Sequence, residues 1–170
     1  NIGGIANVTK VKNDSDNFQN NLSAFDIGPG NCLIDEWVRK NSNKKFDKNG
    51  ELATVGKVDQ LILNQAIDNF KINSYSQSLD IKNFDVSFAR GLSLEDGCAT
   101  ITDFTAYLVA EGLKYIGQKG SITFLLCGGG RKNINLIHCI KNYLKNENNI
   151  TLEVIDNYNL KGDYIESQAF

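Results

Sequence analysis

Three glycine-rich turns constrain the fold of this 170-residue chain more than any other feature. Each of them follows residues of strand-like composition, and they are Gly3-Gly4, Gly28-Pro29-Gly30 and Gly128-Gly129-Gly130. Helical periodicity begins directly after the second and the third turn. Strands that lead through tight turns into helices predict an α/β domain, and in such sheets a ligand crevice lies at the carboxyl ends of the strands.

Apolar patterns predict the other elements in chain order. They favour strands within 1–11, 22–26, 121–127 and 152–155, and helices over 31–41, 57–69, 93–117, from an N-cap at Asn133 onward and after residue 163. Residues 41–56 are expected to form a polar loop, and residues 84–88 alternate as a short extended segment does. The continuous apolar run at 121–127 is typical of a parallel strand that is covered on both faces. The sequence therefore predicts one domain with a mixed, mostly parallel sheet flanked by helices.

The composition is that of a soluble globular protein. Hydrophobic residues make up 41% and charged residues 22% of the chain, and the formal net charge is -2. No basic run is interleaved with aromatic residues, so nucleic acid is not expected as a partner. No apolar run approaches the ~18 residues of a membrane span and no signal peptide opens the chain, so we expect a cytoplasmic protein without a membrane partner.

The cysteines carry no metal-site signal. They are Cys32, Cys98, Cys127 and Cys139, and they lack the paired spacing of metal ligands. Each lies in an apolar or helical context, where a free cysteine behaves as a small hydrophobic residue. We expect reduced core thiols, with a disulfide pair as the alternative, and the sequence predicts no metal-ligating residues.

Asp26 is the strongest candidate for a catalytic residue. It ends an apolar strand directly before the Gly28-Pro29-Gly30 turn, and Asn31 is a suitable N-cap for the helix that follows. A carboxylate at such a position can act as a general base, and the helix N-terminus favours a negative charge nearby. Neither a dinucleotide-binding nor a P-loop motif is present. The residues themselves favour a nucleotide or sugar-phosphate ligand, and a plain scaffold with a capped turn remains the alternative.

The order of the motifs resembles one family. The segments NIGGIANVT, FDIGPGNCLIDEW, DGCATITDFTA, LLCGGGRKN and GDYIES are similar to the C-terminal half of anhydro-N-acetylmuramic acid kinases, over residues 1–170. The resemblance implies a ribonuclease-H-like lobe of the actin-like ATPase fold. It also implies a kinase that uses ATP and Mg²⁺ to phosphorylate the 6-oxygen of 1,6-anhydro-N-acetylmuramic acid while water opens the anhydro ring. The product would be N-acetylmuramate 6-phosphate, formed in peptidoglycan recycling and amino-sugar catabolism, and a homodimer is a further expectation.

The resemblance assigns roles residue by residue. Asp26 matches the base that activates the attacking water. The expected ATP-binding residues are Gly3, Gly4, Asn7, Gly128, Gly129, Gly130 and Asn133. The expected substrate-binding residues are Gly28, Gly30, Asn31 and Glu166.

Two departures from the family pattern bear on activity. Residues 76–80 lack the Pro and the Lys that are usual there, and Ile27 replaces a common Thr beside Asp26. A kinase of this type closes two lobes around ATP, so we expect the chain to be the C-terminal lobe alone, truncated at both ends, without its N-terminal lobe and inactive by itself. The alternative is a non-catalytic or degenerate actin-like nucleotide-binding lobe of a truncated gene product.

Overall fold

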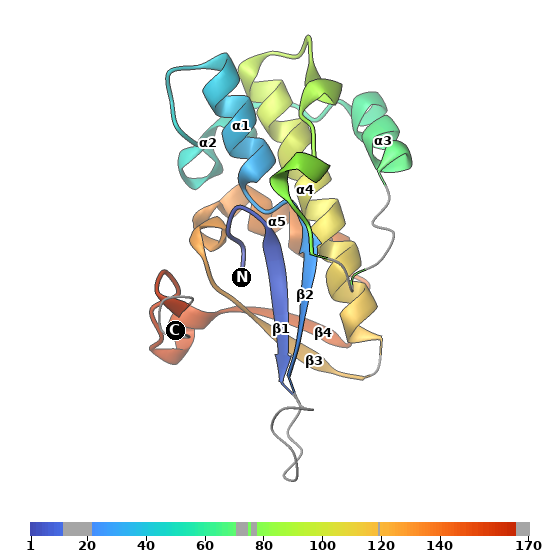
Figure 1. Cartoon of the computed structure of the whole chain (residues 1–170), viewed down its shortest axis with the longest axis vertical. Coiled ribbons are helices and arrows are strands. Elements are labelled where there is room, and N and C mark those ends of the chain that lie inside the picture. Colours follow the sequence, from blue (N-terminus) through green and yellow to red (C-terminus); the bar gives the residue numbers. More distant parts are fainter. Residues whose placement is uncertain (12–21, 71–74, 76–77, 119, 166–170) are drawn as a thin grey trace.

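The computed structural model describes residues 1–11, 22–70, 75, 78–118 and 120–165 as an α/β structure (Figure 1). Strand β1 (Ala6–Val11) pairs antiparallel with β2 (Leu22–Gly28). Strand β3 (Ile122–Leu126) pairs parallel with β4 (Ile150–Val154). The predicted strands are therefore present, but the described residues form two two-stranded sheets in place of one mostly parallel sheet.

Helix α4 (Leu94–Gly117) is the centre of the fold. It packs against β2 and against α1 (Cys32–Asn41), α2 (Glu51–Val55), α3 (Gln60–Asn69) and α5 (Ile134–Tyr143). The helix begins where the Ser93 side chain accepts a hydrogen bond from the Asp96 amide, as an N-cap should. Apolar residues occupy more than one of its faces, and a helix of that kind is buried by neighbours on several sides.

Within the described residues, β1 pairs with β2 and β3 pairs with β4, and on its other side β1 has only the isolated bridge between Ile2 and Ala6. A cavity of about 560 Å³ lies between β1 and β3, and α4 side chains line it. The prediction that β3 is covered on both faces is also wrong, since exposed and buried residues alternate along it and Leu125 is 39% exposed.

Three segments differ from the local predictions. The loop predicted at 41–56 contains α2, which begins where the buried Asp47 carboxylate accepts the amides of Leu52 and Ala53. The segment predicted to be extended at 84–88 instead follows one short 3₁₀ turn, Ile81–Asn83, and runs into a second, Ser87–Ala89. Helix α3 begins three residues later than predicted, at Gln60, because the Asp59 side chain caps it.

The remaining observations on the fold concern the cysteines and the lengths of the helices. All four cysteines are free thiols, and Cys32, Cys98 and Cys127 are buried, as predicted. Within the described ranges, no helix combines the length and the apolar character that a membrane crossing requires. The helix predicted after residue 163 lies almost wholly outside the described residues.

Candidate functional site

The first two glycine turns form one unit. The amide of Asn31 donates to the Gly3 carbonyl at 2.8 Å, and the amide of Cys32 donates to the Gly4 carbonyl at 3.0 Å. Gly30 has a φ of +52°, and a β-carbon there would lie 2.5 Å from the Gly3 carbonyl oxygen. Only glycine fits position 30, because both the backbone angle and the contact exclude a side chain.

These contacts change the role expected of the α1 N-terminus. Asn31 lies in the right-handed helical region, and its side chain makes no capping hydrogen bond, so the prediction that it caps the helix is wrong. An N-cap side chain reaches the helix amides from an extended backbone, which Asn31 does not have. The carbonyls of Gly3 and Gly4 satisfy amides at this end of the helix in its place, so an anion does not find these donors free.

The third glycine turn packs against the chain's first residues. The Ile2 amide donates to the Cys127 carbonyl, and the Gly130 amide donates to the Ile2 carbonyl, both at 2.8 Å. Gly128 has a φ of +81°, and a β-carbon there would lie 2.2 Å from the Asn1 side chain. The loop of residues 1–5 therefore lies between the second and the third glycine turn and contacts both.

Asp26 lies on β2 opposite Asn7 of β1, beside an irregularity in the pairing. Residues that face one another on paired strands project from the same face of the sheet. The neighbouring Ile27 packs onto α4 at Gly112, so Asp26 points to the other face and is half-buried. Its Oδ2 accepts a hydrogen bond of 2.8 Å from the Leu79 amide. The structure thus places two predicted site residues, Asp26 and Asn7, side by side, and adds Leu79 to them.

Two of the site glycines have a side that faces open space. Among the described residues, a β-carbon at Gly4 or at Gly129 would meet no atom within 4 Å beyond the adjoining residues. Both residues are exposed. Packing within the described chain therefore does not require glycine at these positions, and a ligand can approach the backbone closely there.

Asn133 has a structural role in this geometry. Its side chain accepts a hydrogen bond from the Leu136 amide at 3.0 Å and so caps α5, as predicted. Asn133 is 6% exposed, and its Oδ1 lies so near Gly50 that a β-carbon there would be 2.2 Å away.

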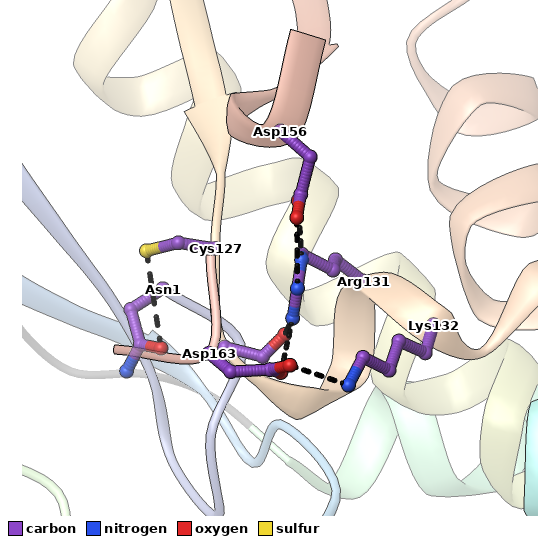
Figure 2. A network of polar contacts seen from close by, with 7 residues as sticks. Asn1, Cys127, Arg131, Lys132, Asp156 and Asp163 are labelled. Atoms are coloured by element: carbon purple, nitrogen blue, oxygen red, sulfur yellow. Dashed lines mark hydrogen bonds and ion pairs between the residues drawn. The ribbon is translucent and has the colours of Figure 1, made fainter. Parts of the chain in front are cut away.

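Charged residues gather beside the third glycine turn (Figure 2), and the sequence did not single out Arg131 or Asp156 among them. Arg131 donates to both carboxylate oxygens of Asp156 and to one of Asp163. These hydrogen bonds lower the pKa of Asp156, and together with a hydrogen bond from Lys132 they hold the pKa of Asp163 at about 2. The partners are 25 and 32 residues away from Arg131 in the chain, so no local sequence pattern signals the pairing.

Some predicted features are not joined to this site. Glu166 lies outside the described residues, as do Ser76 and Gln77 of the altered 76–80 stretch. Among the residues that the structure describes, no group of three or more His, Cys, Asp or Glu side chains could hold a metal ion. The cavity between β1 and β3 includes Asn7 in its lining, but neither Asp26 nor the third glycine turn.

Comparisons with known proteins agree along the whole chain. The family model described as anhydro-N-acetylmuramic acid kinase matches residues 1–170. A protein of that name from Pelagibacter ubique is 49% identical over all of this chain and 45% of its own length. Proteins of the same name from Rhizorhabdus wittichii and Zymomonas mobilis are 36% and 33% identical, again over all of this chain and 44% of their own length. The chain thus spans less than half the length of these curated relatives.

Proposed function

The chain belongs to the anhydro-N-acetylmuramic acid kinase family, and on that premise we propose that it carries part of the active site of an ATP-dependent sugar kinase. The proposed substrate is 1,6-anhydro-N-acetylmuramic acid, and the proposed product is N-acetylmuramate 6-phosphate. One observation supports the assignment most. The loop of residues 1–5 contacts both the Gly28–Gly30 turn and the Gly128–Gly130 turn through its backbone, and Asp26 lies two residues before the first of these two turns.

The proposed reaction needs one base and one phosphoryl donor. A water molecule attacks C1 of the sugar and gives up a proton to the Asp26 carboxylate, while the bond between C1 and the 6-oxygen breaks. The released 6-oxygen takes the γ-phosphoryl group of ATP, and ADP leaves. Because the Leu79 amide occupies Oδ2 of Asp26, we assign proton acceptance to Oδ1. A positioned carboxylate of this kind contributes about 10²–10⁴-fold to such a step.

The nucleotide is proposed to bind at the open glycines. Phosphoryl transfer requires positioning and charge stabilisation more than covalent help, and backbone amides in glycine turns can supply both. Gly4 and Gly129 each present backbone that no side chain of the described residues covers. Mg²⁺ would neutralise phosphate charge, but the described residues contain no cluster of three ligating side chains, so we assign it no step on this chain.

We propose that the chain is one ribonuclease-H-like lobe and that ATP binds between it and a second lobe. Such a lobe needs one sheet, and the contacts around the cavity between β1 and β3 are compatible with that. Asn1 and Asn7 exchange two backbone hydrogen bonds in the antiparallel manner, while the Ile2 amide bonds Cys127 at the end of β3. An extended segment leading into Asn1 along this cavity would run antiparallel to β1 and parallel to β3, and would join both sheets.

The test uses the full-length protein. We expect release of ADP that depends on 1,6-anhydro-N-acetylmuramic acid and not on N-acetylglucosamine, with oxygen from ¹⁸O-water at C1 of the product. Asp26→Asn should lower kcat by about 100-fold or more. Asp85→Asn, which removes an exposed carboxylate elsewhere, serves as the matched control and should leave kcat unchanged. Normal turnover by Asp26→Asn would show that another group is the base.

A second pair of variants tests the contact to Asp26. Leu79→Pro removes the amide hydrogen that bonds Oδ2, whereas Leu79→Ala keeps it and only shortens the side chain. We expect kcat to fall by about tenfold in the proline variant beyond the effect of the alanine variant.

Binding of ATP without any turnover of the sugar would favour the non-catalytic nucleotide-binding lobe instead.

A further inference from the structure

Arg131 invites a simple interpretation, because it follows the glycine turn at which the nucleotide is proposed to bind. A guanidinium beside such a turn is a natural ligand for phosphate oxygens. Its surroundings point elsewhere. The Arg131 side chain is only 6% exposed, and its donors face groups of the chain itself.

The hydrogen bonds of the guanidinium go to three groups of the chain itself. Nε and Nη2 form a two-pronged pair with the two oxygens of Asp156, at 2.7 and 3.1 Å. Nη1 donates to Asp163 at 2.6 Å and to the carbonyl of Gly128 at 2.9 Å. Figure 2 shows Arg131 lying between the two carboxylates. The planar fork thus connects the chain after β4 with the first residue of the third glycine turn.

Both backbone groups of Gly128 form hydrogen bonds. Its carbonyl accepts from Arg131, and its amide donates to the Gly162 carbonyl at 2.9 Å. Gly162 itself packs on the guanidinium, since a β-carbon there would lie 2.4 Å from Nε. Gly129, the next residue, faces open space. The hydrogen bonds that fix Gly128 therefore also set the direction in which Gly129 exposes its backbone.

We propose that Arg131 is a positioning residue that holds the Gly128–Gly130 turn in its nucleotide-binding conformation and that it does not itself bind the phosphates. The proposal rests on the proposed function of this turn. An exposed ion pair contributes little as a rule, but a two-pronged arginine–carboxylate pair with a buried guanidinium restricts geometry far more. Asp156 and Asp163 are then supports for Arg131, and Gly162 is the residue that leaves room for it.

The direction in which the KM for ATP changes distinguishes a positioning role of Arg131 from a role as a phosphate ligand. In the full-length protein, Asp156→Asn should raise the KM for ATP by about tenfold, because the fork loses its charged acceptor and the turn loosens. If Arg131 were a phosphate ligand, the same substitution would free the guanidinium and lower the KM. Arg131→Lys keeps the charge but not the fork, and should raise the KM as Asp156→Asn does. A KM lowered by Asp156→Asn, or left unchanged by Arg131→Lys, would overturn the proposal.

Two further variants act as controls. Gly162→Ala changes no charge but displaces the guanidinium, and should also raise the KM for ATP. Lys132→Met removes a charge beside the turn and leaves every hydrogen bond of Arg131 in place. It should change the KM for ATP by less than about twofold, because Lys132 is exposed and its ion pair with Asp163 is exposed too. For all variants kcat at saturating ATP should change by less than about threefold, because Arg131 touches no reacting atom.

Hydrogen exchange tests the contact without any turnover. In the full-length protein without nucleotide, the Gly128 amide should exchange faster in Arg131→Lys than in the wild type, while the Leu136 amide, which Asn133 caps, should not change. Unchanged exchange at Gly128 would refute the positioning role. If the wild type neither binds nor turns over ATP, the proposed function fails, and the exchange result still decides whether Arg131 holds the turn.

Discussion

Replacing selected glycines by alanine would separate glycines that the fold requires from glycines that a ligand requires. Gly4 and Gly129 have ordinary backbone angles and would meet no neighbour within 4 Å if they carried a β-carbon. An alanine at such a position restricts the unfolded chain, so the free energy of unfolding should stay constant or rise by about 0.4–1 kcal/mol. If these residues face the nucleotide, the added methyl groups occupy ligand space. The KM for ATP should then rise at least about tenfold, which corresponds to about 1.4 kcal/mol of binding free energy.

Two other glycines provide the reference values. Gly91 has a φ of +95° with open space around it, so Gly91→Ala isolates the backbone cost of about 1–2 kcal/mol. Gly30 has a φ of +52° and would place its β-carbon 2.5 and 2.9 Å from the carbonyl oxygens of Gly3 and Gly4. Gly30→Ala adds a steric cost of about 1–3 kcal/mol to the backbone cost, which predicts a total loss of about 2–5 kcal/mol.

The assay combines urea denaturation with ATP titration in the full-length protein. We expect Gly4→Ala and Gly129→Ala to retain their stability and lose ATP affinity, and Gly91→Ala to lose stability and retain affinity. Gly30→Ala should lose both, because the first and second glycine turns separate. Wild-type KM values in both Gly4→Ala and Gly129→Ala would refute the argument that open glycines mark the nucleotide surface.

Three further predictions concern stability and titration. Asp47→Ala leaves two amides at the start of α2 without their acceptor and should lower the free energy of unfolding, measured by urea denaturation, by about 2–4 kcal/mol. Asp59→Ala removes a single such bond and should cost about 1 kcal/mol. Equal losses in the two variants would contradict the buried capping role of Asp47. Burial raises the pKa of Cys32 to about 11, so at pH 8 iodoacetamide should label it far more slowly in the folded than in the urea-unfolded protein, and equal rates would contradict its burial. Hydrogen bonds from Arg131 and Lys132 hold the pKa of Asp163 at about 2, below its ordinary 3.8, so the contribution of these bonds to stability is present above about pH 4 and is lost as the pH falls towards 2. Wild type and Arg131→Met should therefore converge in stability over that window, and a constant difference down to pH 2 would count against this pairing.

Local sequence patterns were sufficient for most of the elements. Helix α4 and the first strand of each sheet follow from apolar patterns, and the cap at Asn133 follows from residue type. These features depend on residues a few positions apart, so the chain itself displays them. The missed helix α2 has only five residues, too few to show a period, and it depends on a carboxylate that is buried by other parts of the fold.

The candidate site was partly visible in the same way. Asp26 and the glycine turns stand out as motifs, and the family resemblance gave their roles as hypotheses. The division into two sheets was not visible, since the antiparallel pair β1–β2 and the parallel pair β3–β4 form separate sheets in the described residues. Apolar composition indicates a strand, but the faces that are covered and the hydrogen-bonded neighbours depend on the rest of the chain.

The sequence by itself determined which residues form the turns and which carboxylate ends the strand before them. The tertiary structure alone decided what those groups contact. Leu79 reaches Asp26 across 53 positions of the chain, and Arg131 reaches Asp163 across 32. Glycine at position 30 is explained by the carbonyls of a loop 26 or more residues earlier. The physical reason is the separation along the sequence over which each interaction acts. Backbone preference and periodicity act between near neighbours. Hydrogen bonds and close packing at the site join segments that only the folded chain brings together.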